Sequence, residues 1–187
     1  MNFIDRREQA GSHTTNLRGL SILTTLGATR RSRSRINAIV LHQMGFSRNS
    51  AANSFDRVIA HFAILLDGTV LHLRDYEAVL NDAYGGHGVE LEFEGDFPSH
   101  GTMLPTGAQV LAGRELVSKI VSDLGTIRGI YAHRHFNPHG RAYCPGPHIW
   151  KNIAEYAANT FSLRMSPPHS RGEIPAEWLG ENYRILS

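Results

Sequence analysis

The run from Ile36 to His42 sets the strongest limit on the fold of this chain. It is short, apolar and β-branched, which is typical of a strand that is buried on both faces. The run ends in a histidine and continues into a loop that contains Gly45 and Ser47. We therefore expect His42 at the end of a core strand, where a sheet commonly presents its functional groups.

Two further segments predict strands. Asp67-Gly68 separates the apolar runs 58–66 and 69–73, and this arrangement is a strong signal for a β-hairpin. Residues 88–94 alternate strictly, so Val89, Leu91 and Phe93 should share one face of a strand. The other face carries Glu90, Glu92 and Glu94. We expect Glu92 and Glu94 to be solvated there.

The second half of the chain predicts helices around one more strand. Residues 106–109, Thr-Gly-Ala-Gln, resemble a capping box, and apolar residues recur behind them at helical spacing until Gly125. Gly129 to His133 is a short strand that again ends in histidine, and a last helix is expected over residues 147–161. This order predicts an α/β fold with a central mixed β-sheet flanked by helices.

A single domain accounts for the chain. Its 187 residues suffice for one compact core, and 41% hydrophobic with 19% charged residues is ordinary for a globular protein. We expect an N-terminal arm over residues 1–34 that packs on the domain. The domain itself is expected over residues 35–165, followed by an extended, proline-containing tail over residues 166–187.

The charge and the apolar runs exclude several classes of protein. A formal charge of +2 does not indicate a general nucleic-acid binder, and no run approaches the roughly 20 apolar residues of a membrane span. For the basic run 30–35 we expect a solvated flank, with contact to an anionic polymer as the alternative. The first residues, 1–7, lack the apolar core of a signal peptide, so we expect synthesis as a cytoplasmic species.

The histidines indicate a metal site. Four of the eleven lie close to the only cysteine, Cys144: His133, His135, His139 and His148. A single cysteine forms no internal disulfide, and it is either an inert core residue, a nucleophile or a metal ligand. Catalytic zinc sites use three nitrogen, sulfur or oxygen ligands and leave a fourth position open. His42, His133 and Cys144 form a candidate set, although spacing alone leaves a structural role for each histidine equally open.

Four ordered segments carry a resemblance to a known family. They are Ile39-Val40-Leu41-His42, then Ala60-His61-Phe62 with Asp67-Gly68-Thr69-Val70, then Gly88-Val89-Glu90-Leu91-Glu92, and finally Ala132-His133-Arg134 with Cys144-Pro145-Gly146-Pro147. In this order, over roughly residues 35–160, they resemble the type 2 N-acetylmuramoyl-L-alanine amidases. That family includes phage-lysozyme amidases, muropeptide-recycling amidases and peptidoglycan recognition proteins. The resemblance implies a fold of this kind and zinc-dependent hydrolysis of the amide between N-acetylmuramic acid and L-alanine.

The resemblance also implies roles for individual residues. His42, His133 and Cys144 would bind Zn²⁺, and Glu90 would be the catalytic carboxylate, as in the recycling branch. Cysteine as third ligand is similar to the phage and recognition branch, in which a tyrosine stands where this chain has Ala60. Many relatives carry a lysine where this chain has Ala142, and we expect the neighbouring Arg141 to supply that positive charge.

Several alternatives stay open. His135 is a rival ligand because it lies two residues from His133, on the same side of an extended chain. We expect a structural role for His61, and His87 and His139 are candidates for the rim of the cleft.

Two other functions compete with hydrolysis by a zinc amidase. Ala60 and Ala142 favour a non-catalytic module that binds peptidoglycan. A cysteine hydrolase would use Cys144 with His133, but we expect no helix N-terminus at Cys-Pro-Gly to lower the pKa of the thiol.

The expected partner is peptidoglycan or a muropeptide, and action on a wall would follow release or delivery of the protein.

Overall fold

The computed structural model describes residues 1–11, 14–16, 23–25, 29–80, 84, 86–98 and 103–185. Its strands are β1 (Asn2–Asp5), β2 (Thr14–Asn16), β3 (Leu23–Thr25), β4 (Ala38–Gln43), β5 (Phe62–Ile64), β6 (Thr69–His72), β7 (Gly88–Phe93) and β8 (Gly129–Ala132). Its α-helices are α1 (Arg7–Gly11), α2 (Gly107–Leu124), α3 (Pro147–Ile149) and α4 (Glu155–Phe161), with a π-helical turn at Trp150–Ala154 between the last two. Short 3₁₀ turns lie at Arg33–Arg35, Ala52–Ser54, His133–His135, Ala176–Leu179 and Glu181–Tyr183.

A mixed sheet of six strands forms the centre of the domain, in the order β1-β6-β5-β7-β4-β8. Only the hairpin partners β5 and β6 run antiparallel; the other four neighbouring pairs are parallel. Strand β4 lies between β7 and β8, and its residues from Ala38 to Leu41 are fully buried. The predicted mixed sheet, the core strand ending near His42 and the hairpin at Asp67-Gly68 are therefore confirmed.

Helix α2 begins and ends where the sequence predicts. The hydroxyl of Thr106 accepts a hydrogen bond from the backbone N–H of Gln109 at 3.0 Å, and Gly125 ends the helix with φ of 62°. The Gln109 side chain does not return to Thr106 as a full capping box requires. It is buried and donates to the carbonyl groups of Ile64 and Glu94, which ties the helix start to the sheet.

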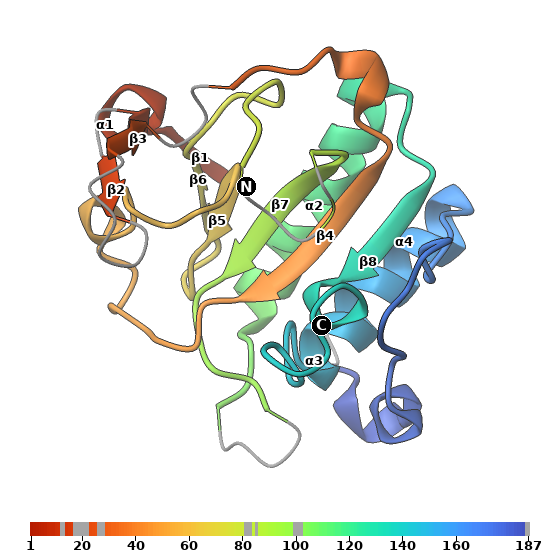
Figure 1. Cartoon of the computed structure of the whole chain (residues 1–187). Helices are drawn as coiled ribbons and strands as arrows, with labels where there is room; N and C mark the ends of the chain where they lie inside the picture. Colours follow the sequence, from red (N-terminus) through yellow and green to blue (C-terminus); the bar gives the residue numbers. More distant parts are fainter. Residues whose placement is uncertain are drawn as a thin grey trace.

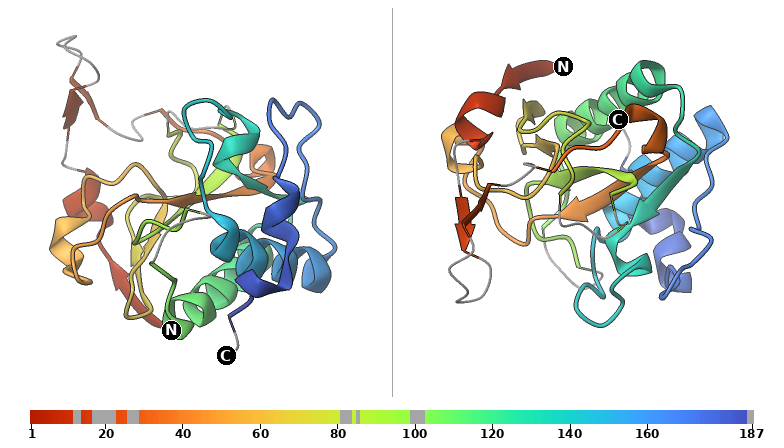
Figure 2. Two further views of the ribbon diagram at one scale, coloured as in Figure 1. Left: turned by 90° about the horizontal axis from the view of Figure 1, so that it is seen from below. Right: turned by 45° about the horizontal axis from the view of Figure 1, so that its top comes forward.

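The two long helices cover one face of the sheet and leave the site on the other. Figure 1 shows α2 and α4 behind the sheet, and they stay on one side of it in the views of Figure 2. The side chains on that face of the central strands, such as Leu41, Leu91 and Ile130, join the core cluster that includes both helices. Because side chains alternate along a strand, His42 and Glu90 point to the opposite face.

The prediction for the glutamates of β7 was wrong for Glu94 and Glu92. The Glu94 side chain is fully buried, and that of Glu92 is 17% exposed. The loop after β4 and the start of the β5–β6 turn fold over this end of the sheet and bond to Glu94, so the face is covered rather than solvated.

The basic run also differs from the solvated flank that we expected. Arg31 is buried, and its guanidinium donates hydrogen bonds to the carbonyl groups of Tyr76 and Gly88. Its neighbours Arg30 and Arg33 pair with acidic side chains of the segment 75–77. The basic run therefore binds to the segment 75–77 instead of being free in solvent.

The two ends of the chain contribute more regular structure than the sequence indicated. Residues 2–5 of the expected N-terminal arm form β1, which pairs in parallel with β6 at the sheet edge. Residues 12, 13, 17–22 and 26–28 of that segment, and 186–187 of the tail, lie outside the described residues. The tail carries two 3₁₀ turns and buries Trp178. No helix in the described part of the chain combines the length and the apolar character needed to cross a membrane.

Candidate metal centre

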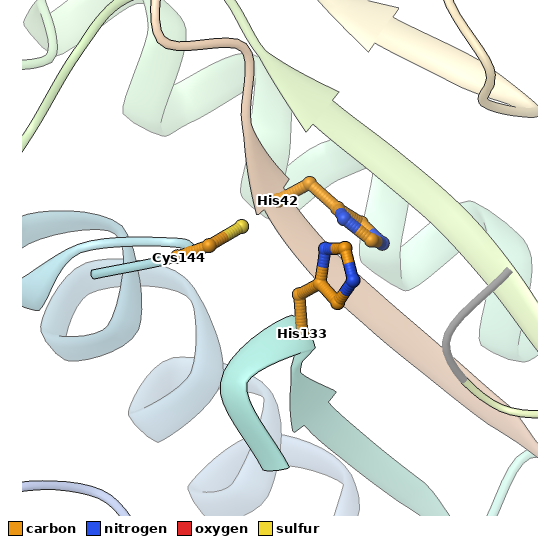
Figure 3. A group of neighbouring side chains, drawn as sticks. All are labelled: His42, His133 and Cys144. Carbon is orange, nitrogen blue, oxygen red and sulfur yellow. The ribbon is translucent and has the colours of Figure 1, made fainter. Parts of the chain in front are cut away.

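Three side chains from separate segments converge at one end of the central strands. His42 stands near the end of β4, His133 follows directly after β8, and Cys144 lies in the loop before α3. Figure 3 shows the two imidazoles and the thiol pointing toward one another. One ligand atom of each residue lies within 4.8 Å of the others, and the two imidazole rings meet edge to face with centroids 4.4 Å apart.

The parallel pairing of β4 with β8 explains why the histidines meet. The register places Leu41 beside Ala132, so the residues that follow, His42 and His133, lie next to each other at the same end of the two strands. Two separate short strands thus deliver their terminal histidines to one point.

Backbone contacts hold Cys144 toward the histidines. Its N–H donates to the carbonyl of Arg141 at 3.1 Å, and its carbonyl accepts from the N–H of Arg134 at 3.2 Å. The sulfur accepts from the backbone N–H of Gln43 at 3.4 Å. The Gln43 side chain in turn donates to the carbonyl of Tyr143 at 3.1 Å, which joins the loops after β4 and before α3.

The protonation of the group suits metal binding. Burial, followed by the electrostatic effects of His42 and Arg141, lowers the pKa of His133 to about 2. The imidazole is therefore neutral, as a ligand must be. Burial and the nearby Glu92 raise the pKa of the Cys144 thiol, so this thiol keeps its proton until a cation displaces it.

Strand β7 places two carboxylates beside His42. Glu90 is 1% exposed, and its Oε2 contacts Nε2 of the His42 imidazole. Glu92 lies one pair further along, with Oε1 at 3.9 Å from His42 Nδ1. Burial raises the pKa of Glu92 to about 7, against the opposing effects of His42 and Arg141.

A cavity of about 270 Å³ opens above the three candidate ligands. It is lined by His42, Gln43, Met44, Gly45, Glu92, His133, Gly140, Arg141, Ala142, Tyr143 and Cys144. Arg141, to which the resemblance led us to assign the missing positive charge, is one of these lining residues. Gln43 and the exposed Tyr143 are cavity residues that sequence reasoning missed, because nothing in the local pattern marks them. Glu92, which we expected to be solvated, also lines the cavity.

The histidines that the sequence offered as alternatives do not belong to the ligand group. His135 is buried, and its Nδ1 accepts a hydrogen bond from the N–H of Ala132 at 3.1 Å. The group of converging ligand atoms contains His133 and not His135. His61 is fully buried; its Nδ1 accepts from the N–H of Glu90 at 3.0 Å, which agrees with the structural role predicted for it. The residues lining the cavity do not include His87 or His139.

The surroundings of Cys144 do not suit a nucleophile. Contrary to the prediction, a helix does begin nearby, with α3 starting at Pro147. Burial nevertheless raises the pKa of the thiol, and the side chain is 6% exposed. A nucleophilic cysteine needs the opposite, a lowered pKa and access to solvent.

The sequence profile of one protein family matches this chain. The family is described as N-acetylmuramoyl-L-alanine amidase, and the match covers residues 32–147. All three candidate ligands, both carboxylates and Arg141 lie inside the matched segment. No curated protein sequence gives a significant match.

Solved structures with the same fold include enzymes and recognition proteins. The N-acetylmuramoyl-L-alanine amidase LysC from Clostridium intestinale is 17% identical, with a TM-score of 0.58 over 88% of this chain and 99% of that one. Drosophila peptidoglycan recognition protein SA is 17% identical, with a TM-score of 0.60 over 92% and 99% of the two chains. Peptidoglycan recognition protein LE, solved in complex with tracheal cytotoxin, a monomeric diaminopimelic acid-type peptidoglycan, is 16% identical, with a TM-score of 0.58 over 86% and 95%. At these identities the likeness shows the fold alone.

Proposed function

Because the chain belongs to the N-acetylmuramoyl-L-alanine amidase family, we propose that it hydrolyses the amide bond between N-acetylmuramic acid and L-alanine in peptidoglycan or muropeptides, with Zn²⁺ as cofactor. The observation that carries the proposal is the convergence of His42, His133 and Cys144 at the floor of a cavity. Two imidazoles and one thiol are a complete ligand set for a catalytic zinc ion.

The residues present fit this ion. Zinc prefers nitrogen and sulfur donors at about 2.0–2.3 Å, which brings three ligand atoms within roughly 4 Å of one another. The spacing of the three side chains is close to this value. When bound, zinc polarises the scissile carbonyl and makes water a stronger nucleophile.

The chain itself supplies the remaining chemistry. A carboxylate of β7 takes the proton of the attacking water and returns it to the departing amine; the resemblance assigns this role to Glu90. Arg141 lines the cavity, and its guanidinium would stabilise the negative charge that develops on the carbonyl oxygen. It would thereby replace the lysine that many relatives carry at the position of Ala142.

A direct test uses purified peptidoglycan and a soluble N-acetylmuramoyl-L-alanyl peptide. We expect new L-alanine amino termini to appear with the zinc-loaded protein, and to disappear after chelation and return on adding zinc. Release of reducing sugar ends without new amino termini would refute the proposal, because it would show cleavage of the glycan rather than of the amide.

A second candidate function is binding of peptidoglycan without cleavage. It is favoured by two alanines. Ala60 is fully buried and stands where the phage branch carries a tyrosine, and Ala142 in the cavity wall stands where many relatives carry a lysine. Retained binding to purified wall, with no new amino termini from a fully zinc-loaded protein, would support this function over the first.

A further inference from the structure

We infer that the C-terminal tail, over its described residues 166–185, positions the metal ligands, and that Arg134 is the positioning residue through which the tail acts. The inference rests on the zinc site of the proposed function, but it does not depend on hydrolysis. The family profile matches residues 32–147, so membership of the family implies no role for the tail.

Arg134 joins the two segments that carry His133 and Cys144. It follows His133 directly, in the 3₁₀ turn His133–His135 after β8. Its backbone N–H donates to the carbonyl of Cys144 at 3.2 Å, and Nη1 of its guanidinium donates to the carbonyl of Ala142. The Arg134 side chain offers no acceptor to a cation, yet this residue holds two of the three ligand-bearing segments together.

The loop between this turn and α3 has little regular structure of its own. Its residues 136–146 form turns and bends, without helix or strand. The position of Cys144 relative to His133 therefore depends on contacts with other parts of the chain. The N–H of Gln43 supplies one of them, at the sulfur, and Arg134 supplies two more at carbonyl groups.

The tail packs against the guanidinium of Arg134. The ring centroid of Trp178 lies 5.0 Å from the guanidinium carbon, inside the roughly 6 Å at which a cation is attracted to an aromatic face. Trp178 is fully buried and belongs to the core cluster, so its ring has a fixed place. Lys151 secures the residues that follow, since its Nζ donates to the carbonyl of Leu179 at 2.9 Å and pairs with Glu181 at 2.8 Å. Figure 1 shows this part of the tail, in dark blue, beside α3.

The tail also bonds to the backbone of the ligand-bearing turn. The N–H groups of Arg171 and Gly172 donate to the carbonyl of His135 at 2.6 Å and 3.2 Å. A Cβ at Gly172 would lie 2.7 Å from the carbonyl oxygen of Arg134, so the two backbones approach about as closely as glycine permits. The tail thus holds both the backbone of the turn and the side chain that leads from it to the Cys144 loop.

The affinity for an ion depends on how well these contacts hold. Zinc needs its nitrogen and sulfur ligands at about 2.0–2.3 Å, so a Cys144 loop that drifts from His133 lowers the affinity. Groups that orient metal ligands without touching the metal change its affinity by about 10–100-fold when they are mutated. Coupling between two sites is reciprocal, so a tail that favours the binding geometry is itself stabilised when the ion binds.

The first test measures zinc affinity in Arg134→Met, which keeps an unbranched stem and removes the guanidinium. The matched control is Arg57→Met, the same change at an exposed arginine that does not line the cavity. The zinc dissociation constant is measured by competition with a chromophoric chelator, after urea unfolding without metal has confirmed that each variant folds. We expect Arg134→Met to weaken zinc binding by about tenfold or more, and the control to match wild type. Arg134→Lys restores a cation and a donor, and should recover part of the loss.

Two further measurements separate positioning of the ligands from a general loss of stability. Co²⁺ bound to a thiolate gives a near-ultraviolet charge-transfer band, and we expect this band to be weaker in Arg134→Met than in wild type at full cobalt loading. Hydrogen exchange of the Arg171 and Gly172 amides should slow when zinc binds to wild type, and should slow by a smaller factor in Arg134→Met. The amides of α2 serve as the reference for global unfolding.

The inference is overturned if Arg134→Met binds zinc with wild-type affinity and cobalt with an unchanged thiolate band. If Arg134→Met does not fold, Arg134→Gln keeps a donor without the charge, and the same loss of zinc affinity is expected of it. A wild-type protein that binds zinc without cutting the amide would refute the proposed hydrolysis only, and the zinc affinities would still decide the role of Arg134. A wild-type protein that binds no zinc would refute both.

Discussion

Replacing Glu94 by glutamine should loosen the loop that carries one wall of the cavity. Glu94 is fully buried, and its Oε1 accepts hydrogen bonds from the Ser47 hydroxyl at 2.8 Å, the Arg48 N–H at 2.6 Å and the Ser50 N–H at 3.3 Å. Its Oε2 accepts from the N–H of Leu66 at 3.0 Å. One carboxylate thus joins the loop after β4, which lines the cavity at residues 43–45, to the β5–β6 turn.

The size of the expected loss of stability follows from the hydrogen bonds that a glutamine side chain cannot accept. Its amide keeps one acceptor oxygen and turns the other into a donor, so at least one buried N–H faces a second donor. An unsatisfied buried N–H costs about 1–3 kcal/mol, and the remaining bonds lose their charge assistance. We expect Glu94→Gln to lower the free energy of unfolding by about 2–4 kcal/mol, which at roughly 2–4 °C per kcal/mol lowers the Tm by about 5–15 °C.

The pH dependence gives an independent check. Burial alone would raise the pKa of Glu94, but the bonds from Arg48, Leu66, Ser47 and Ser50 outweigh it and hold the pKa below its ordinary value. A carboxyl with a lowered folded-state pKa contributes stability above its unfolded pKa, near 4.5, and that contribution is lost as pH falls through the folded-state pKa. The difference between wild type and variant should therefore be full at pH 7 and shrink below about pH 4.

The assay is urea unfolding of wild type, Glu94→Gln and the exposed control Glu173→Gln at pH 7 and at acidic pH, all without metal. The control should stay within about 0.5 kcal/mol of wild type, as surface changes usually do. A loss for Glu94→Gln inside that same limit, or a loss that does not change with pH, would refute the account of Glu94 as an ionised anchor of the loop.

Three more changes test the site. Gly146→Ala puts a side chain on a backbone with φ of 91° and places its Cβ 2.1 Å from the carbonyl oxygen of Phe97. The free energy of unfolding, measured in urea, should fall by more than about 2 kcal/mol. An unchanged unfolding midpoint would contradict this packing. His135→Leu removes the acceptor of the Ala132 N–H and should lower the free energy of unfolding by about 1–3 kcal/mol in the same assay. Metal analysis should still find one zinc per chain. Loss of zinc would show that His135 is a ligand. Cys144→Ser should lose zinc affinity and thermal stability together, because metal binding is coupled to folding, and unchanged zinc content by atomic absorption would show that another residue completes the site.

The parts of the fold that local sequence determines were predictable. Apolar runs with β-branched residues gave β4 and β8, Asp67-Gly68 gave the hairpin, and Thr106 with Gly125 gave the bounds of α2. These features depend on turn chemistry and side-chain periodicity within about ten residues, which the chain carries in itself. The positions of His42 and His133 were predictable in the same way, because a strand that ends in histidine presents that side chain at the end of the strand whatever its neighbours are.

Other features depend on contacts between distant segments, and only the tertiary structure decided them. Strand β1 exists because β6 offers a partner edge, and Glu94 is buried because two loops bring N–H groups to it. The alternation of β7 placed Glu90 and Glu92 on one face, but it could not say that Glu90 contacts His42 while Glu92 lines the cavity. That distinction depends on the register of β7 against β4, and register is fixed by long-range pairing that a local pattern does not contain.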